Sequence, residues 1–189
     1  MPILGTIASS TQQGLSTTAF QSIQTVTVNP AVAYVEFTTI PATFKNLQIR
    51  FVAKTASSSV GSSATRIEYN GDTTTANYFS NYLMFLGSPS STRYANFNAG
   101  PNYGTWVANN GGVQANSFGF GVVDIYDYTN TNKYTSSLNS SGLADNSHTQ
   151  FHHSAATWQN TALVTSLRLT AYDGYFVAGS IFALYGIKG

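Results

Sequence analysis

Apolar and polar residues alternate in short segments along most of the chain. The clearest segment is residues 47–54, which read LQIRFVAK and place an apolar residue at every odd position. A period of two is typical of a β-strand with one face on a hydrophobic core. We therefore predict a strand here, with Gln48, Arg50 and Lys54 facing away from the core.

Similar segments follow one another, separated by Gly, Pro, Asn or Ser. We predict further strands at residues 23–28, 32–37, 66–69, 77–86, 118–126, 133–138, 150–158, 163–170 and 175–187. No segment of helical length repeats apolar residues at helical spacing. This pattern of about nine or ten short strands predicts an all-β, antiparallel β-sandwich with a jelly-roll-like topology.

Local signals refine this prediction. Asn70-Gly71 predicts a hairpin turn, because both residues tolerate a positive φ. Glycines in the segment 118–126 indicate a bulge or a close backbone approach. We expect the final core strand to end in a tight turn at Gly186. We also expect six phenylalanines to fill the core, namely Phe37, Phe51, Phe118, Phe120, Phe176 and Phe182.

Two segments do not read as regular strands. Residues 1–22 are rich in Ser, Thr and Gln, and we predict an extended N-terminal arm, or a segment ordered only by partners, followed by a sandwich domain at 23–189. An ordinary flexible terminus is the equally weighted alternative. Residues 87–117 predict a long irregular region, and the Ser140–Thr149 segment a shorter loop. Long loops are usually functional or interfacial, so Tyr103 and Trp106 are candidate contacts for a protein partner or a glycan.

The composition of the chain reduces the number of function classes that fit it. Charged residues make up only 8% of the chain, against about 25% in an average soluble domain, and Ser, Thr, Asn, Gln, Gly and Tyr take their place. Such a surface desolvates at low cost, which favours a part of an assembly or a surface that contacts sugars. The net charge is +1 with no basic run, which argues against nucleic-acid binding.

The sequence shows neither the pattern of a signal peptide nor that of a membrane-spanning helix. The first basic residue is Lys45, and the longest apolar stretch, near 181–187, is far shorter than the ~20 residues of a membrane-spanning helix. We expect a protein that is made in a cytoplasm and then assembled, with no membrane partner. The chain has no Cys, which rules out disulfides and thiolate zinc sites.

No residue cluster predicts catalysis. His152 and His153 are neighbours in a predicted strand and point to opposite faces, and His148 lies in a loop without a carboxylate nearby. The carboxylate pairs Asp124 with Asp127 and Glu68 with Asp72 show no glycosidase or calcium-loop pattern. Serines lack a nucleophile elbow, and Gly111-Gly112 lies in no phosphate-binding motif. We predict no enzyme activity, cofactor or metal.

Several short motifs, in order, resemble those of small structural proteins of tailed bacteriophages. They are FTTIPATFKNLQI at 37–49, YNGD with NY within 69–78, IYDY with KY within 125–134, Trp158, and GSIFALYGI at 179–187. The order and spacing are more specific than any single motif. The resemblance covers about residues 36–187.

This resemblance implies a virion protein with a jelly-roll-like sandwich and no catalytic residues. We expect a head decoration (cement) protein that binds the major capsid protein or other virion proteins as a homo-oligomer, most simply a trimer. The alternative is a tail-fibre, tail-tip or knob domain that binds a host-surface glycan or receptor. The two alternatives share a fold, so the sequence leaves both open.

Overall fold

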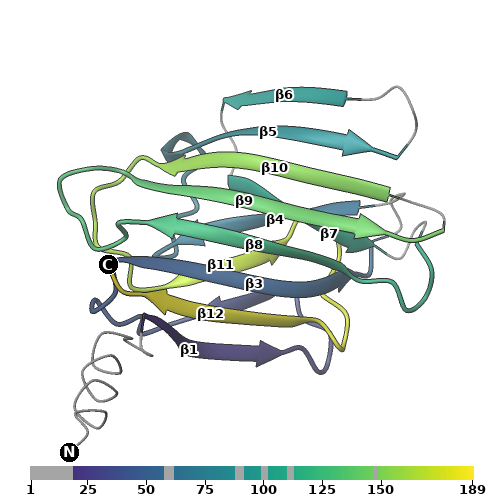
Figure 1. Ribbon diagram of the computed structural model, residues 1–189, viewed down its shortest axis with the longest axis horizontal. Helices are drawn as coiled ribbons and strands as arrows, with labels where there is room; N and C mark the ends of the chain where they lie inside the picture. Colours follow the sequence, from purple (N-terminus) through teal and green to yellow (C-terminus); the bar gives the residue numbers. More distant parts are fainter. Residues whose placement is uncertain (1–18, 58–61, 88–91, 99–101, 110–112, 147–148) are drawn as a thin grey trace, which may run out of the picture.

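The computed structural model describes residues 19–57, 62–87, 92–98, 102–109, 113–146 and 149–189. Twelve β-strands and one short 3-10 helix, η1 (Thr75–Asn77), account for its regular structure. The strands form two layers, with a large sheet in front of a small one in Figure 1. The predicted all-β sandwich is confirmed.

The large sheet contains eight strands, each antiparallel to its neighbours. In spatial order they are β1 (Phe20–Thr27), β12 (Ile181–Ile187), β3 (Asn46–Thr55), β8 (Gly119–Tyr126), β9 (Thr135–Ala144), β10 (Thr149–Trp158), β5 (Tyr78–Leu86) and β6 (Thr92–Asn98).

The small sheet contains four antiparallel strands that lie behind the large sheet in Figure 1. Their order is β2 (Tyr34–Phe37), β11 (Leu167–Ala171), β4 (Ser62–Tyr69) and β7 (Asn102–Asn109). A short parallel pairing of Lys54 and Thr55 with Ala108 and Asn109 joins β3 to β7. The two layers are therefore continuous at one corner.

The strand pairing is nested in the manner of a jelly roll. β3 pairs with β12 in the large sheet, β4 pairs with β11 in the small sheet, and β5 pairs with β10 in the large sheet again. Successive strands from the two halves of the chain thus pair in alternate layers, as expected when a long antiparallel ribbon wraps into two sheets. This nested pairing confirms the predicted jelly-roll-like topology.

The core fills the space between the layers at the end formed by β12, β3 and β8. In β3, Leu47, Ile49, Phe51 and Ala53 are buried, as their alternation predicts. Phe37, Phe176 and Phe182 are fully buried in the same cluster, which confirms four of the six predicted core phenylalanines. Phe51 and Phe182 stack with ring centroids 6.0 Å apart.

The prediction of an irregular region at 87–117 is wrong, because this region contains β6 and β7. Asn, Gly and polar residues have low β-propensity, and their pattern alone does not indicate strands. The hydrogen-bonding edges of β5 and β4 impose the extended conformation instead. In the same way β9 extends to Ala144, where a loop from Ser140 was predicted, because β8 and β10 pair with it on both sides.

The turn at Asn70-Gly71 forms, but it closes no hairpin. Both residues have positive φ, 52° and 70°, and Asp72 N donates to Tyr69 O at 2.9 Å. The chain then leaves the small sheet and enters β5 of the large sheet, which pairs with β10 and β6 rather than with β4. The turn signal is therefore local, and the tertiary pairing decides where the next strand goes.

Three side-chain predictions are also wrong. Phe120 is exposed and Phe118 is only partly buried, because β8 turns Gly119, Val123 and Ile125 inward instead. Lys54 is buried, since the turn at 113–117 lies over it and its Nζ donates to the carbonyls of Gln114 and Ala115, each at 2.9 Å.

Gly186 lies within β12 and forms no turn. A Cβ at this position would lie 2.3 Å from the ring of Phe44, so the glycine is required by close packing rather than by its φ. Gly121 shows the predicted close approach, because the Phe51 ring occupies the position of its missing Cβ. At the other end of the chain, residues 1–18 of the predicted arm lie outside the described residues, and β1 already begins at Phe20.

Candidate binding face of the large sheet

The outer face of the large sheet, which points away from the small sheet, carries many exposed apolar side chains. Most of the large apolar side chains that are exposed in the described part of the chain lie here. They are Phe20, Val52, Phe79, Phe85, Phe120, Tyr126, Leu138, Phe151 and Ile181. Singly exposed apolar residues are ordinary, whereas a contiguous set on one face indicates a contact surface.

Five of these side chains form one row across the sheet. The register joins Ile181 to Val52, Val52 to Phe120, Phe120 to Gly142, Gly142 to Phe151, and Phe151 to Phe85. We call this set the apolar row. Its side chains are exposed by between 43% at Ile181 and 56% at Phe120. Direct cross-strand neighbours lie about 5 Å apart, so the row is continuous across six strands.

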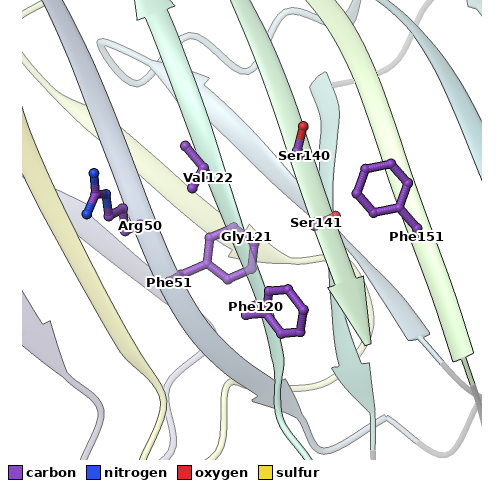
Figure 2. Close-up of a pocket in the computed structure, with 8 residues that line it drawn as sticks. All are labelled: Arg50, Phe51, Phe120, Gly121, Val122, Ser140, Ser141 and Phe151. Atoms are coloured by element: carbon purple, nitrogen blue, oxygen red, sulfur yellow. The ribbon is translucent and has the colours of Figure 1, made fainter. Parts of the chain in front are cut away.

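A depression lies beside the apolar row, between the rings of Phe120 and Phe151 (Figure 2). It has a volume of about 270 Å3 and is open to solvent, and its lining also includes Arg50, Phe51, Gly121, Val122 and Ser140. Gly142 is buried, because the Phe120 ring lies over it, 3.4 Å from the position that a Cβ would take.

Charged groups on this face are paired within the face. Gln48 Nε2 donates to Asp124 Oδ1 at 2.6 Å, and Arg50 Nε donates to Gln48 Oε1 at 2.7 Å. The Arg50 guanidinium also lies over the rings of Phe20 and Tyr185, 4.9 and 5.4 Å from their centroids. Cation–π contact and hydrogen bonding thus hold the arginine against the sheet. The result is a face with little unpaired charge among its described residues.

His153 extends the polar part of the same face. Its Nδ1 lies 2.7 Å from Ser140 Oγ on the neighbouring strand, and its ring stacks on Phe151 with centroids 6.5 Å apart. His152 points to the other side of β10 and is buried between the layers, 3% exposed. The two histidines therefore lie on opposite faces, as predicted, although His152 is more deeply buried than the expected half-exposed residue.

The interior beneath β9, β10 and β5 holds more polar side chains than the core beneath β3 and β12. Its buried polar side chains are Thr135, Ser137, Asn139, Ser141, His152, Ser154 and Ser80. Tyr78, Tyr82, Leu143, Ala156 and Trp158 are buried on the same three strands. Asn139 Nδ2 donates to Ser154 Oγ at 2.9 Å, and His152 Nε2 lies 3.3 Å from Gln150 Oε1. Burial lowers the pKa of His152 to about 4, so the imidazole is neutral at neutral pH.

The outer face of the small sheet is charged and internally paired. Arg168 on β11 lies between Glu36 on β2, at 3.1 Å, and Glu68 on β4, at 3.9 Å. The Arg168 guanidinium also lies 4.4 Å from the centroid of the Tyr34 ring. Burial raises the pKa of Glu68, and the nearby Arg168 opposes that effect. The described charges on this face therefore pair with one another, and the Arg168 guanidinium lies against the exposed Tyr34 ring.

The carboxylates considered for catalysis are separately engaged. Asp127 forms ion pairs with Lys45 and Lys133, whereas Asp124 belongs to the hydrogen-bonded group on the outer face. Glu68 faces Arg168, and Asp72 lies in a turn. Among the described residues, no three His, Cys, Asp or Glu side chains gather as a metal site would require. In the same part of the chain, no helix is long and apolar enough to cross a membrane.

The YNGD and NY motifs within 69–78 form a hydrogen-bonded network with Trp158. Asp72 accepts hydrogen bonds from Trp158 Nε1 and Asn77 Nδ2, each at 2.8 Å, and from Thr74 N at 2.9 Å. Tyr78 donates to Asp72 O at 2.7 Å and accepts from Tyr69 N at 3.1 Å. Burial raises the pKa of Asp72, but these hydrogen bonds outweigh it and hold that pKa below its usual value. These motifs therefore encode the crossover between the sheets rather than a binding site.

The predicted contacts Tyr103 and Trp106 lie on β7 and not on a loop. Their backbones pair with Arg66 and Ala64 of β4, and their side chains lie outside the described residues. The apolar row itself was missed by the sequence analysis. The sequence does contain a signal for this row. Residues 51–53 and 83–86 are apolar at both odd and even positions, which indicates strands with two apolar faces.

Comparison of the chain with protein-family models, with curated proteins and with solved structures gave no match.

Proposed function

We propose that this protein is a non-enzymatic structural component of a tailed-phage particle, a head decoration (cement) protein that stabilises the capsid surface. The observation that carries this proposal is the apolar row, which crosses six strands of the large sheet and remains exposed in the single chain. A contiguous apolar surface on an otherwise polar protein is suited to burial against a neighbouring protein.

Two further features support the proposal. The low charge of the chain makes its surface inexpensive to desolvate, which suits a protein packed among neighbours. The motifs that resemble those of phage structural proteins supply the buried network around Asp72, so the resemblance extends to the residues that hold the fold together. The protein would be made in the host cytoplasm and would function on the virion.

The apolar row also favours a protein partner over a sugar. Its side chains are Phe, Val and Ile, which have no polar end to hydrogen-bond a hydroxyl group. Sugar-binding platforms use Tyr and Trp, whose polar ends stay wet while their rings stack. The tail-fibre alternative, with a glycan at Tyr103 and Trp106, finds no comparable support among the described side chains.

Electron microscopy of intact particles that carry the protein tests this proposal. We expect density for the sandwich on the outer surface of the capsid. Density at the tail tip or on a fibre would favour the tail-fibre alternative. Absence of the protein from the particle would contradict both candidate functions.

A binding assay tests the role of the apolar row in the same proposal. Phe120→Ser with Phe151→Ser should lower the occupancy of protein added back to particles that lack it. Tyr134→Ser with Tyr175→Ser is a matched control, because these rings are equally exposed but lie in loops away from the row. Equal occupancy for both double variants would exclude the row as a contact.

A further inference from the structure

We infer that the partner that covers the apolar row is a second copy of this chain, packed face to face across a two-fold axis. The inference rests on the proposed function in one respect, because both require the outer face to be buried against a protein of the particle, here a second copy whose loss would also lower the occupancy. It goes further by naming that protein and the geometry of the contact.

The first argument is area. Because a large apolar side chain presents about 200 Å2 when fully exposed, the five half-exposed side chains of the row present on the order of 500 Å2 of apolar surface. That value lies near the upper end for a monomer, for which the largest patch is about 300–600 Å2. With the other exposed apolar side chains of this face, Phe20, Phe79, Tyr126 and Leu138, the apolar surface approaches the ~800 Å2 per partner of a stable interface.

The second argument is charge. Arg50 and Asp124 are the solvent-accessible charged side chains that the structure describes in the strands of this face, and Gln48 links them into one hydrogen-bonded group. A face that is neutral within itself does not repel an identical face. Among the described side chains of this face, a strongly charged partner would find no unpaired charge to bind, whereas a second copy presents the same uncharged chemistry.

The third argument is shape. Phe120 is the most exposed side chain of the row and also lines the depression, so a protruding ring and a depression lie side by side. A two-fold axis in the plane of contact, between the ring and the depression, would place Phe120 of each copy over the depression of the other. The depression, about 270 Å3, is large enough for a phenyl ring, since an apolar cavity of about 150 Å3 holds benzene. Such self-complementarity is what an isologous contact requires.

Sedimentation analysis of the purified chain between about 1 and 100 μM tests the inference. We expect a monomer–dimer equilibrium. Phe120→Ser with Phe151→Ser should raise the dissociation constant at least about tenfold, and Tyr134→Ser with Tyr175→Ser should leave it unchanged. A wild-type monomer throughout this range, the trimer expected from the sequence, or a dimer that survives the Phe120/Phe151 variant would each overturn the inference.

Ser140→Leu separates a specific contact from non-specific hydrophobic association. Ser140 lines the depression, so the substitution adds apolar surface but fills the depression, and it should weaken the dimer if a Phe120 ring enters there. Stronger association of this variant would contradict the proposed geometry. Circular dichroism and thermal unfolding of each variant confirm that it is folded.

Cross-linking locates the contact. Because the chain has no Cys, a single introduced Cys reports only its own position. With facing sheets about 10 Å apart, Ser140→Cys next to the depression should be joined across copies by a short bismaleimide. Thr73→Cys, in an exposed turn outside the face, should remain largely unlinked.

Other occupants of the face give different results. If a monomer became a dimer only after removal of residues 1–18, the N-terminal segment of the chain would be the occupant instead. A monomer that binds particles through the row would leave the proposed function standing while overturning the two-fold contact. The two proposals can therefore fail separately.

Discussion

Two glycines of the large sheet, Gly186 and Gly142, serve different purposes. Gly186 faces inward, and the Phe44 ring occupies the space that a side chain would need. Gly142 faces outward, and the exposed ring of Phe120 lies over it. In sequence, Gly186 follows Leu184-Tyr185 and Gly142 follows Ser140-Ser141, and neither context indicates which ring lies over the glycine. Their roles differ because the Phe44 ring is buried, whereas the Phe120 ring can shift toward solvent.

Gly186→Ala should destabilise the fold by about 1–3 kcal/mol, because its Cβ would lie 2.3 Å from a buried aromatic ring that has little room to move. Gly142→Ala is the control. Its Cβ would meet the exposed Phe120 ring at 3.4 Å, and a glycine in a strand gains from substitution by alanine. Urea unfolding of both variants measures the difference. Equal stability would show that the Phe44 contact is not restrictive.

At the scale of elements, the connection from β4 to β5 decides the topology. The turn at Asn70-Gly71 ends the small-sheet strand, and η1 leads into the large sheet. Asp72 links this connection to Trp158 at the end of β10, which pairs with β5. The side chain of one turn residue thereby fixes the point where the chain changes layer.

Asp72→Asn should destabilise the protein by about 1–3 kcal/mol. The carboxylate accepts from Trp158 and Asn77 at Oδ2 and from Thr74 at Oδ1, and an amide presents only one acceptor oxygen. At least one of these donors would lose its partner. Thermal or urea unfolding gives the change in stability.

Asp124→Asn is the matched control for this prediction. Asp124 is a partly exposed acceptor for Gln48, and an amide oxygen can replace it there, so the expected change is within about 0.5 kcal/mol. If both variants unfolded alike, the Asp72 network would contribute nothing special to the crossover.

At the scale of the whole molecule, the interior is divided. One end of the sandwich holds the apolar cluster, and the other, beneath β9, β10 and β5, holds hydroxyl, amide and imidazole groups. Buried ionisable groups make stability depend on pH, because burial opposes their ionisation. His152 is the group for which this matters near physiological pH.

Stability should therefore fall as the pH falls from about 6.5 to about 4. Between these values the unfolded chain protonates at His152, whereas in the folded chain burial lowers the pKa of His152 to about 4. The unfolded state binds more protons, so acidification favours it, by at most roughly 3 kcal/mol in total.

Urea unfolding across this pH range measures the effect of His152. His152→Gln should flatten the pH profile relative to the wild-type protein, and His153→Gln, on the outer face, serves as the comparison variant. Comparing the variants cancels the contribution of carboxylates to the pH dependence of stability in the same range. An unchanged slope in His152→Gln would contradict a buried neutral imidazole.

Much of this protein is determined locally by the sequence. The alternation at 47–54 defines a strand and its buried side, and the Asn70-Gly71 pair defines a turn, because both depend on residues close together in the chain. The all-β class follows from the sum of such segments. None of these predictions requires knowledge of which strands meet.

Tertiary structure alone decided which faces are covered. Phe51 and Phe120 look alike in sequence, yet Phe51 is buried and Phe120 is the most exposed side chain of the apolar row. A strand pattern assigns residues to two sides but does not say which side receives a second layer. Here the four-stranded sheet covers one side of the large sheet, and the other side remains exposed to solvent.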